Sequence, residues 1–306
     1  MITSCAINIF LLRTLFVKEI ILKHTLEDGT LLAATFLPEY GMNLYSLKKG
    51  EIEVIDQSTK PLFDERLSGF GPLIGPHFFH RKEGDIPFVP DETIFPHLAH
   101  IRKSGSKEPF SHGIARYVPW NYTATETEVS AHLSGMDTYH GMTLAALEGF
   151  DFLMTFKAHI TAHGLEIEMH TESIGRPSIA GLHYYFALGD HSGHVKMKCK
   201  NQYGDKGQWR DIPSRWLAPS GEVNFDLSEE SDYTFTPISS DFSGEALLTT
   251  PSHNLKIHYK TASDENAFQL YHPPGASFVC IEPVTAKDPR DLKQRKNTLF
   301  VKILPY

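Results

Sequence analysis

The sequence predicts an all-β protein, a large and mostly antiparallel β-sandwich. Apolar and polar residues alternate with a period of two in several segments, which is typical of strands with one buried face. Turn-forming glycine, proline, asparagine and aspartate interrupt these segments, as in HGLE and YGDKG. Between Thr35 and Cys280 no amphipathic run reaches the length of a typical capped helix, about 12 residues. Long helices are therefore not expected.

The alternation places apolar side chains on one face of five segments. In chain order these are Glu51 to Ile55 (EIEVI), Thr125 to Leu133 (TETEVSAHL), Phe152 to Ile160, Leu165 to His170 (LEIEMH) and Leu255 to Tyr259 (LKIHY). Each segment is expected to form a half-buried strand. Only Leu144 to Phe150 and a few shorter pieces are expected to be helical.

The chain is expected to form one domain over residues 1–306. Its length of 306 residues first suggests two domains of about 150 residues, but all-β sandwiches and barrels commonly exceed that size. The sequence has no repeat of fixed period and no low-complexity linker, which disfavours propellers and solenoids. Hydrophobic residues make up 41% of the chain, which is enough for a sizeable core and excludes a disordered protein.

The charge balance points to a small-molecule partner. The 29 basic and 37 acidic residues give a net charge of -8, which argues against nucleic acid or an anionic membrane as the main partner. Beyond the N-terminus, no segment approaches the roughly 18 apolar residues that a membrane-spanning helix needs. A neutral or small charged substrate fits this balance better.

The cysteines and the N-terminus bear on the compartment. Cys5, Cys199 and Cys280 are an odd number without CxxC spacing, so neither a disulfide framework nor a zinc ribbon is expected. A reducing cytoplasm is the default location. The apolar start, MITSCAINIFLLRTLFVKEIIL, lacks a basic n-region, and Arg13 and Lys18 interrupt it. We expect a first strand or an over-long start here rather than a signal peptide.

The proline-rich stretch from Leu73 to Pro119 is the longest irregular segment. Long ordered loops on a β scaffold usually carry a binding site, so a site is expected here first. Three HxxH pairs lack a recognisable third ligand, and no metal site is predicted from them. These pairs are His77/His80, His97/His100 and His191/His194. Because P-loop, GxGxxG and GxSxG motifs are also missing, acid/base chemistry by histidine and carboxylates remains.

Four short segments follow one another in an informative order. They are GFGPLIGPHFFHR ending at Arg81, SHGIARYVPW around His112, GLHYYFALGD around His183, and FVCIEPVTA around Glu282. In this order and spacing they resemble the aldose 1-epimerase family, also called galactose mutarotase-like. The resemblance runs from PEYGMNLYSLKKGEIEVI near the start to IEPVTA near the end.

The resemblance implies a many-stranded β-sandwich with a concave face open to an unmodified sugar. In the family, a histidine in an HxYF-like segment is the general acid and a glutamate in the EP segment is the general base. These roles carry over to His183 and Glu282. The family's arginine and its HG histidine contact sugar hydroxyls, which implies the same for Arg81 and His112.

Two further substrate-binding residues follow from the same resemblance. A family aspartate that binds the sugar matches Asp232 in SDYTF best, although Asp226 and Asp241 flank it. Gln269 in AFQLYHP resembles a segment that lines the family's pocket. No cofactor and no metal are implied.

The chemistry of mutarotation agrees with these residue types. A base removes the proton of the anomeric hydroxyl while an acid protonates the ring oxygen, and histidine and glutamate can be tuned for both tasks. Strand alternation places His183 and Tyr185 on one face of LHYYF. It also places Glu282 with Cys280, opposite Ile281. Both polar side chains can therefore face a cleft while their neighbours fill the core.

Several functions remain open at this stage. The first is a mutarotase acting on a free hexose. The second is a mutarotase for a hexose phosphate, which would need extra cations near the pocket; Arg102, Lys103 and Lys107 are the candidates. A non-catalytic sugar-binding or regulatory protein of the same fold is the third, and a metal-dependent isomerase is the fourth.

Overall fold

The structure is a computed structural model that describes residues 18–306. The interpretation of the apolar start as a first strand or an over-long start concerns residues 1–17 above all, and these lie outside the described part. The first strand, β1 (Ile20–Thr25), begins at the end of that apolar stretch. No helix within the described residues is long and apolar enough to cross a membrane.

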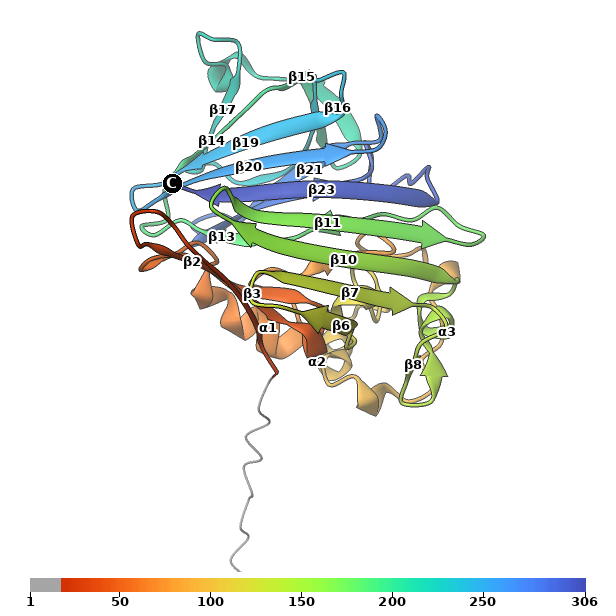
Figure 1. The fold of residues 1–306 in the computed structure, drawn as a ribbon. Helices are drawn as coiled ribbons and strands as arrows, with labels where there is room; N and C mark the ends of the chain where they lie inside the picture. The colour runs from red at the N-terminus through yellow and green to blue at the C-terminus, as the bar shows by residue number, and fades with distance from the viewer. Residues whose placement is uncertain (1–17) are drawn as a thin grey trace, which may run out of the picture.

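Two large antiparallel sheets form most of the molecule (Figure 1), and this confirms the predicted all-β class. The nine-stranded sheet, in spatial order, consists of β17 (Val223–Asp226), β14 (His194–Met197), β19 (Ser243–Thr249), β20 (Asn254–Thr261), β23 (Lys296–Pro305), β11 (Gly164–Ser173), β10 (Phe152–Thr161), β7 (Glu128–Ser134) and β6 (Asn121–Ala124). The eight-stranded sheet consists of β16 (Gln208–Asp211), β15 (Cys199–Asp205), β18 (Ser231–Pro237), β21 (Ala267–His272), β22 (Phe278–Val284), β12 (Gly181–Leu182) and β5 (Leu73–Ile74), with β13 (Tyr185–Ala187) also paired to β22.

Smaller elements complete the fold. A four-stranded sheet contains β1, β2 (Leu31–Leu37), β3 (Asn43–Lys49) and β4 (Ile52–Glu53), and a small hairpin contains β8 (Thr138–Tyr139) and β9 (Met142–Thr143). The α-helices of the described part are α1 (Lys60–Arg66), α2 (His97–Lys103) and α3 (Leu144–Glu148). Figure 1 shows α1 and α2 at the lower edge, beside the four-stranded sheet. The expectation of a single domain over residues 1–306 stays a prediction.

Four of the five predicted strands are strands in the structure. They overlap β7, β10, β11 and β20, and the predicted helical piece contains α3. The Thr143 hydroxyl accepts a hydrogen bond from Ala146 N at the start of α3, and Gly149, with φ of 91°, ends the helix. The segment Glu51 to Ile55 is only partly a strand, because β4 covers Ile52–Glu53 alone. The Glu53 carboxylate accepts hydrogen bonds from Leu47 N and Ile55 N, and Ile55 forms an isolated antiparallel bridge with Phe186.

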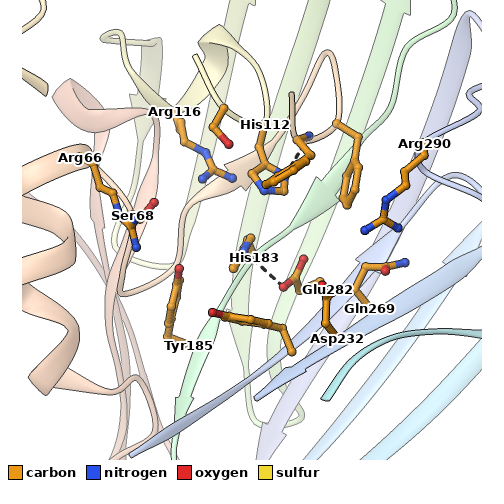
Figure 2. Close-up of a pocket in the computed structure, with 14 residues that line it drawn as sticks. Arg66, Ser68, His112, Arg116, His183, Tyr185, Asp232, Gln269, Glu282 and Arg290 are labelled. Carbon is orange, nitrogen blue, oxygen red and sulfur yellow. Dashed lines mark hydrogen bonds and ion pairs between the residues drawn. The ribbon is translucent and has the colours of Figure 1, made fainter. Parts of the chain in front are cut away.

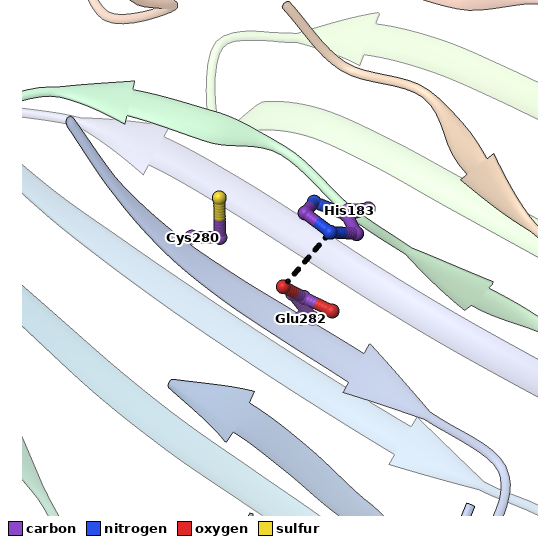
Figure 3. A group of neighbouring side chains, drawn as sticks. All are labelled: His183, Cys280 and Glu282. Carbon is purple, nitrogen blue, oxygen red and sulfur yellow. Dashed lines mark ion pairs between the residues drawn. The ribbon is translucent and has the colours of Figure 1, made fainter. Parts of the chain in front are cut away.

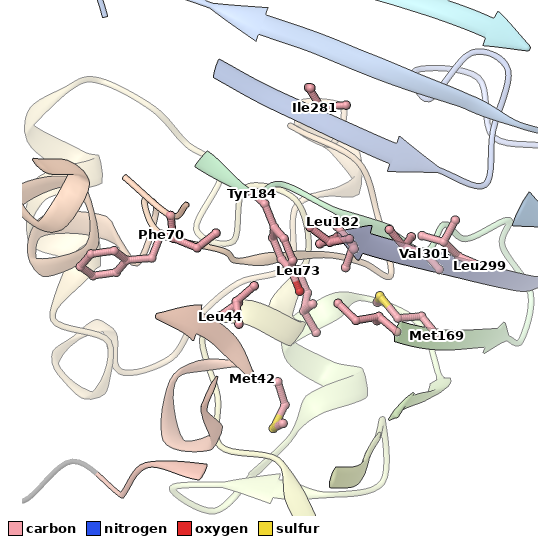
Figure 4. Close-up of a cluster of buried hydrophobic side chains, with 14 of the residues drawn as sticks. Met42, Leu44, Phe70, Leu73, Met169, Leu182, Tyr184, Ile281, Leu299 and Val301 are labelled. Atoms are coloured by element: carbon pink, nitrogen blue, oxygen red, sulfur yellow. The ribbon is translucent and has the colours of Figure 1, made fainter. Parts of the chain in front are cut away.

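The core lies between the sheets (Figure 4), where β11 and β23 contribute Met169, Leu299 and Val301. On β10 the buried and exposed residues alternate, as predicted from the period of two. Phe156 is fully buried and contacts the edge of Phe36, with ring centroids 5.5 Å apart. This contact joins the four-stranded sheet to the nine-stranded sheet.

Truncating Phe156 therefore removes packing at the junction of two sheets. We expect Phe156→Ala to lower the free energy of unfolding by about 3–5 kcal/mol, because it leaves a cavity that a rigid core fills only in part. Urea denaturation measures the change. Leu153→Ala is the matched control, because Leu153 lies on the opposite face of β10 and is 46% exposed. Equal losses in the two variants would contradict the assignment of the inner face.

Candidate active site

A cavity of about 380 Å³ lies against the eight-stranded sheet. Its volume is in the range of small-molecule sites, about 300–1,000 Å³. The sheet side of the cavity consists of His183, Tyr185, Asp232, Gln269, Tyr271 and Glu282. The opposite side consists of Arg66, Ser68, Phe78, Phe79, Ser111, His112, Arg116 and Arg290. Much of the second group comes from the irregular stretch Leu73 to Pro119, and the expectation that this stretch carries a binding site stays a prediction.

Strand pairing brings His183 and Glu282 together. Gly181 pairs with Val284 and Tyr185 pairs with Cys280, so His183 lies directly across from Glu282 in an antiparallel arrangement. The distance from His183 Nε2 to Glu282 Oε1 is 3.3 Å, and both side chains are buried (Figure 2).

Neighbouring side chains follow the predicted alternation of faces. Tyr185 stacks on the His183 ring, with centroids 5.0 Å apart, and it also lines the cavity. Leu182, Tyr184 and Ile281 point to the other side and belong to the hydrophobic core (Figure 4). Core packing on one face therefore fixes the positions of the polar groups on the other.

Burial dominates the electrostatics of this pair. Burial lowers the pKa of His183, and the positive charge of Arg116 lowers it further. Burial raises the pKa of Glu282 well above its usual range, Arg116 opposes this shift, and the negative charge of Asp232 adds to it. Each shift disfavours the charged form of its group. Between the two pKa values the pair therefore holds one proton, with the neutral form favoured.

Cys280 lies on the same face of β22 as Glu282 (Figure 3). Ligand atoms of His183, Cys280 and Glu282 lie within 4.8 Å of one another, and within residues 18–306 no other three-residue group of potential metal ligands was found. None of the HxxH pairs joins such a group in that part of the chain. An imidazole, a thiol and a carboxylate would suit a soft divalent metal, but burial raises the pKa of the thiol and so disfavours the thiolate that binds metal.

Gln269 and Asp232 line the cavity, and their predicted roles in substrate binding stay predictions. Gln269 pairs with Glu282 across β21 and β22, and its Oε1 accepts a hydrogen bond from the Thr234 hydroxyl at 2.7 Å. Its buried Nε2 has no hydrogen-bond partner within the described residues. Because an unpaired buried donor is costly, this amide is suited to a ligand oxygen. The carboxylate of Asp232, on β18, lines the cavity beside Tyr271.

His112 also lies at the cavity, with its ring at 5.2 Å from the His183 ring. Burial lowers the pKa of His112, and the charge of Arg116 contributes, so the imidazole is neutral. Phe79 N lies 3.4 Å from Nδ1 and donates to it. A neutral ring whose Nδ1 accepts carries its hydrogen on Nε2.

Arg81 does not line the cavity, in contrast to the role that the family resemblance implied for it. Its guanidinium donates to both oxygens of the buried Glu108 carboxylate and to the Glu148 carbonyl oxygen. These bonds direct the side chain away from the cavity. We therefore do not assign Arg81 to substrate binding.

Three other arginines line the cavity, and the sequence interpretation did not select them. Arg116 donates from Nε and Nη2 to the Leu73 carbonyl oxygen, and Arg290 lies 6.0 Å from the Phe78 ring centroid. Within residues 18–306, neither these two nor Arg66 forms an ion pair with a carboxylate. Arg116 lies inside the SHGIARYVPW segment that carries the family resemblance, so this motif could have pointed to it.

The cations proposed from the sequence for a phosphate group lie elsewhere. Arg102 pairs with Glu92, and Lys107 pairs with Glu83. Neither they nor Lys103 lines the cavity.

Comparison with known proteins gives the family. The profile of the aldose 1-epimerase family matches residues 23–290, and the chain belongs to this family. No curated protein matched the sequence.

Solved structures show the same fold. The Slr1438 protein of Synechocystis sp. PCC 6803 is 19% identical, with a TM-score of 0.63 over 93% of this chain and 95% of that chain. A galactose mutarotase-like protein from Lactobacillus casei is 16% identical, with a TM-score of 0.63 over 93% and 100% of the two chains. An aldose epimerase homologue from C. elegans is 13% identical, with a TM-score of 0.62 over 94% and 99%. At these identities the similarity concerns the fold alone.

Proposed function

We propose that the protein is an aldose 1-epimerase that interconverts the α and β anomers of a free hexose. The observation that carries this proposal is the buried contact between His183 and Glu282, 3.3 Å apart on the sheet side of the cavity. Family membership supports an epimerase in general, and the cavity gives it a place to act.

One proton on the pair suffices for the reaction. In the reactive form Glu282 is a carboxylate and His183 is an imidazolium. This form arises from the neutral form when one proton moves from Glu282 to His183 along the 3.3 Å contact. Glu282 takes the proton of the anomeric hydroxyl while the bond between C1 and the ring oxygen breaks. The electron pair of that bond stays on the ring oxygen, which receives the proton of His183. The product is the open-chain aldehyde.

Ring closure reverses these transfers. Rotation about the C1–C2 bond presents the other face of the aldehyde, and the ring oxygen attacks C1 as His183 recovers its proton. Glu282 returns its proton to the former aldehyde oxygen. Both groups regain their starting states, so the cycle consumes no cofactor and needs no metal. The anomeric and ring oxygens are bonded to the same carbon, which explains why two groups a few ångströms apart serve both.

Other cavity residues are suited to hold the sugar. His112 offers an N–H donor, Gln269 an unpaired amide and Asp232 a carboxylate, and these match sugar hydroxyls. Tyr185 and Tyr271 present aromatic rings to the apolar face of a pyranose.

Removal of the base gives the direct test. We expect Glu282→Gln to fold normally yet lose mutarotation by about 10²- to 10⁴-fold, because glutamine keeps the volume but cannot take the proton. Polarimetry of freshly dissolved α-glucose and α-galactose, with EDTA present and the spontaneous rate subtracted, measures the loss. Glu168→Gln is the matched control, because Glu168 also contacts a histidine, His170, but on β11 away from the cavity.

A second pair of variants checks the coupling of acid and base. His183→Asn should cost a similar factor, and the double variant should cost less than the product, since both transfers belong to one event. If Glu282→Gln catalysed mutarotation at the wild-type rate, the assignment of Glu282 as the base would be contradicted. A wild-type protein that binds sugar without accelerating mutarotation would instead indicate a non-catalytic sugar-binding protein.

A second candidate is a mutarotase for a hexose phosphate, and Arg66 and Arg116 favour it. The charges of Arg116 and Arg66 both lower the pKa of His183, and Arg116 also acts on Glu282, so both guanidinium groups lie within electrostatic reach of the pair. His183 acts on the ring oxygen, which is bonded to C5, and C5 carries C6. A phosphate on C6 would therefore lie near these guanidinium groups, which suit phosphate oxygens.

The hexose-phosphate candidate predicts a preference for glucose 6-phosphate over glucose. Arg66→Gln should reduce kcat/KM for glucose 6-phosphate by about 10- to 100-fold, the worth of a hydrogen bond to a charged group, and leave glucose unaffected. Polarimetry with both sugars measures the preference. Arg215→Gln, at an exposed pair with Glu229, is the control. Equal kcat/KM for the two sugars would exclude this candidate and leave the free hexose.

A further inference from the structure

Two buried carboxylates lie behind the cavity, between two of the loops that line it. The first loop spans residues 75–81 and carries Phe78 and Phe79; the second spans residues 108–116 and carries Ser111, His112 and Arg116. Glu108 and Glu148 are 2% and 0% exposed. Neither lines the cavity.

Both carboxylates connect the two loops, Glu108 from its own place at the start of the second loop and Glu148 from the end of α3. Glu108 accepts hydrogen bonds from the Arg81 guanidinium and from Phe110 N, at 3.0 Å for Arg81 Nε and 3.0 Å for Phe110 N. Glu148 contacts His77 Nδ1 at 2.5 Å and accepts from Ile114 N at 3.0 Å. Each carboxylate thus binds one side chain of the first loop and one backbone N–H of the second.

The two anchored N–H groups flank His112 symmetrically, two residues before and two residues after it. His112 has a φ of 66° and Gly113 a φ of 92°. A non-glycine residue is costly in this left-handed region and stays there only when its surroundings impose it. The imposed turn also receives direct bonds from the first loop, from Gly75 N to His112 O at 2.8 Å and from His112 N to Phe79 O at 2.9 Å.

The charge of the network makes it rigid. Burial raises the pKa of Glu108, but the hydrogen bonds and charge of Arg81 and the charge of His77 outweigh this and hold the pKa at about 2. The carboxylate is therefore ionised and depends on its partners, because an uncompensated buried charge is strongly destabilising. The His77 ring lies between the two carboxylates, with Nε2 at 3.9 Å from Glu108 Oε2.

We propose that Glu108 and Glu148 are positioning residues that fix the His112 turn and so direct the Nε2–H of His112 into the cavity. Arg81 then acts through Glu108 and Glu148 rather than by touching the sugar. The kinetic half of the test rests on the proposed function, whereas the spectroscopic half does not.

Long-range ¹H–¹⁵N spectra of the full chain test the position of His112 without any substrate. In the wild-type protein we expect His112 to be a single Nε2–H tautomer, because Phe79 N donates to its Nδ1. In Glu148→Gln we expect a mixture of tautomers. Glu53→Gln is the matched control, because the Glu53 carboxylate also accepts backbone N–H groups but does not line the cavity. An unchanged His112 signal in Glu148→Gln would overturn the proposal.

Kinetics separate positioning from general stability. We expect Glu148→Gln to reduce kcat/KM by about 10- to 100-fold, as small misplacements near a reacting centre do, and to have no further effect when combined with His112→Ala. An equal loss in both backgrounds would show a structural role alone and overturn the proposal.

Two further outcomes are informative. If the wild-type protein turns over no sugar, the proposed function fails, and the His112 spectra still decide the positioning role. If Glu148→Gln does not fold, Arg81→Lys replaces it in both experiments, because lysine keeps the charge but cannot bond Glu108 through two nitrogens and the Glu148 carbonyl at once. The same shift of the His112 tautomer is then expected, and its absence overturns the proposal.

Discussion

The active-site geometry depends on one buried contact, between the His183 imidazole and the Glu282 carboxyl. Antiparallel pairing of β22 with β12 and β13 places the two residues opposite each other. Leu182, Tyr184 and Ile281 pack into the core from the other face. A shift of register by one residue would bury the polar groups in the core and send the apolar ones into the cavity. Sheet packing thus fixes the distance between the two groups that we propose as acid and base.

Burial of two titratable groups is costly, and the surroundings reduce that cost unequally. Arg116 opposes the rise in the pKa of Glu282 and adds to the fall in the pKa of His183. One shared proton lets both groups be neutral, which avoids the large penalty of a buried charge. Under the proposed function, a sugar hydroxyl would supply the partner that Gln269 Nε2 lacks within residues 18–306.

Features with a simple period could be predicted from the sequence. The alternation in β7, β10, β11 and β20 identified strands and their buried faces. The order of the motifs indicated the family and selected five residues that line one cavity in the structure: His112, His183, Asp232, Gln269 and Glu282. Side-chain partners in the irregular stretch could not be predicted, because they depend on how loops pack. Arg81 meets Glu108, 27 positions later, and that contact has no sequence period.

The arginines of the cavity come from outside the large sheets. Structures with 13–19% identity share the fold over more than nine-tenths of the chain. Arg66, Arg116 and Arg290 come from a helix end and from loops, on the side of the cavity that faces the sheet. If the proposed function holds, residues outside the sheets can change the charge around the substrate while the proposed acid and base keep their places on the sheet.

We expect the buried pair to hold one proton, with Glu282 neutral. Infrared spectroscopy tests it most directly, through the carbonyl band of a protonated carboxyl that Glu282→Gln removes and Glu168→Gln retains. Because burial raises the pKa of Glu282 well above 4.5, the band should persist above that pH and disappear only as the pH rises through the raised pKa. A Glu282 signal that is lost near the ordinary glutamate value of 4.5 would contradict the claim.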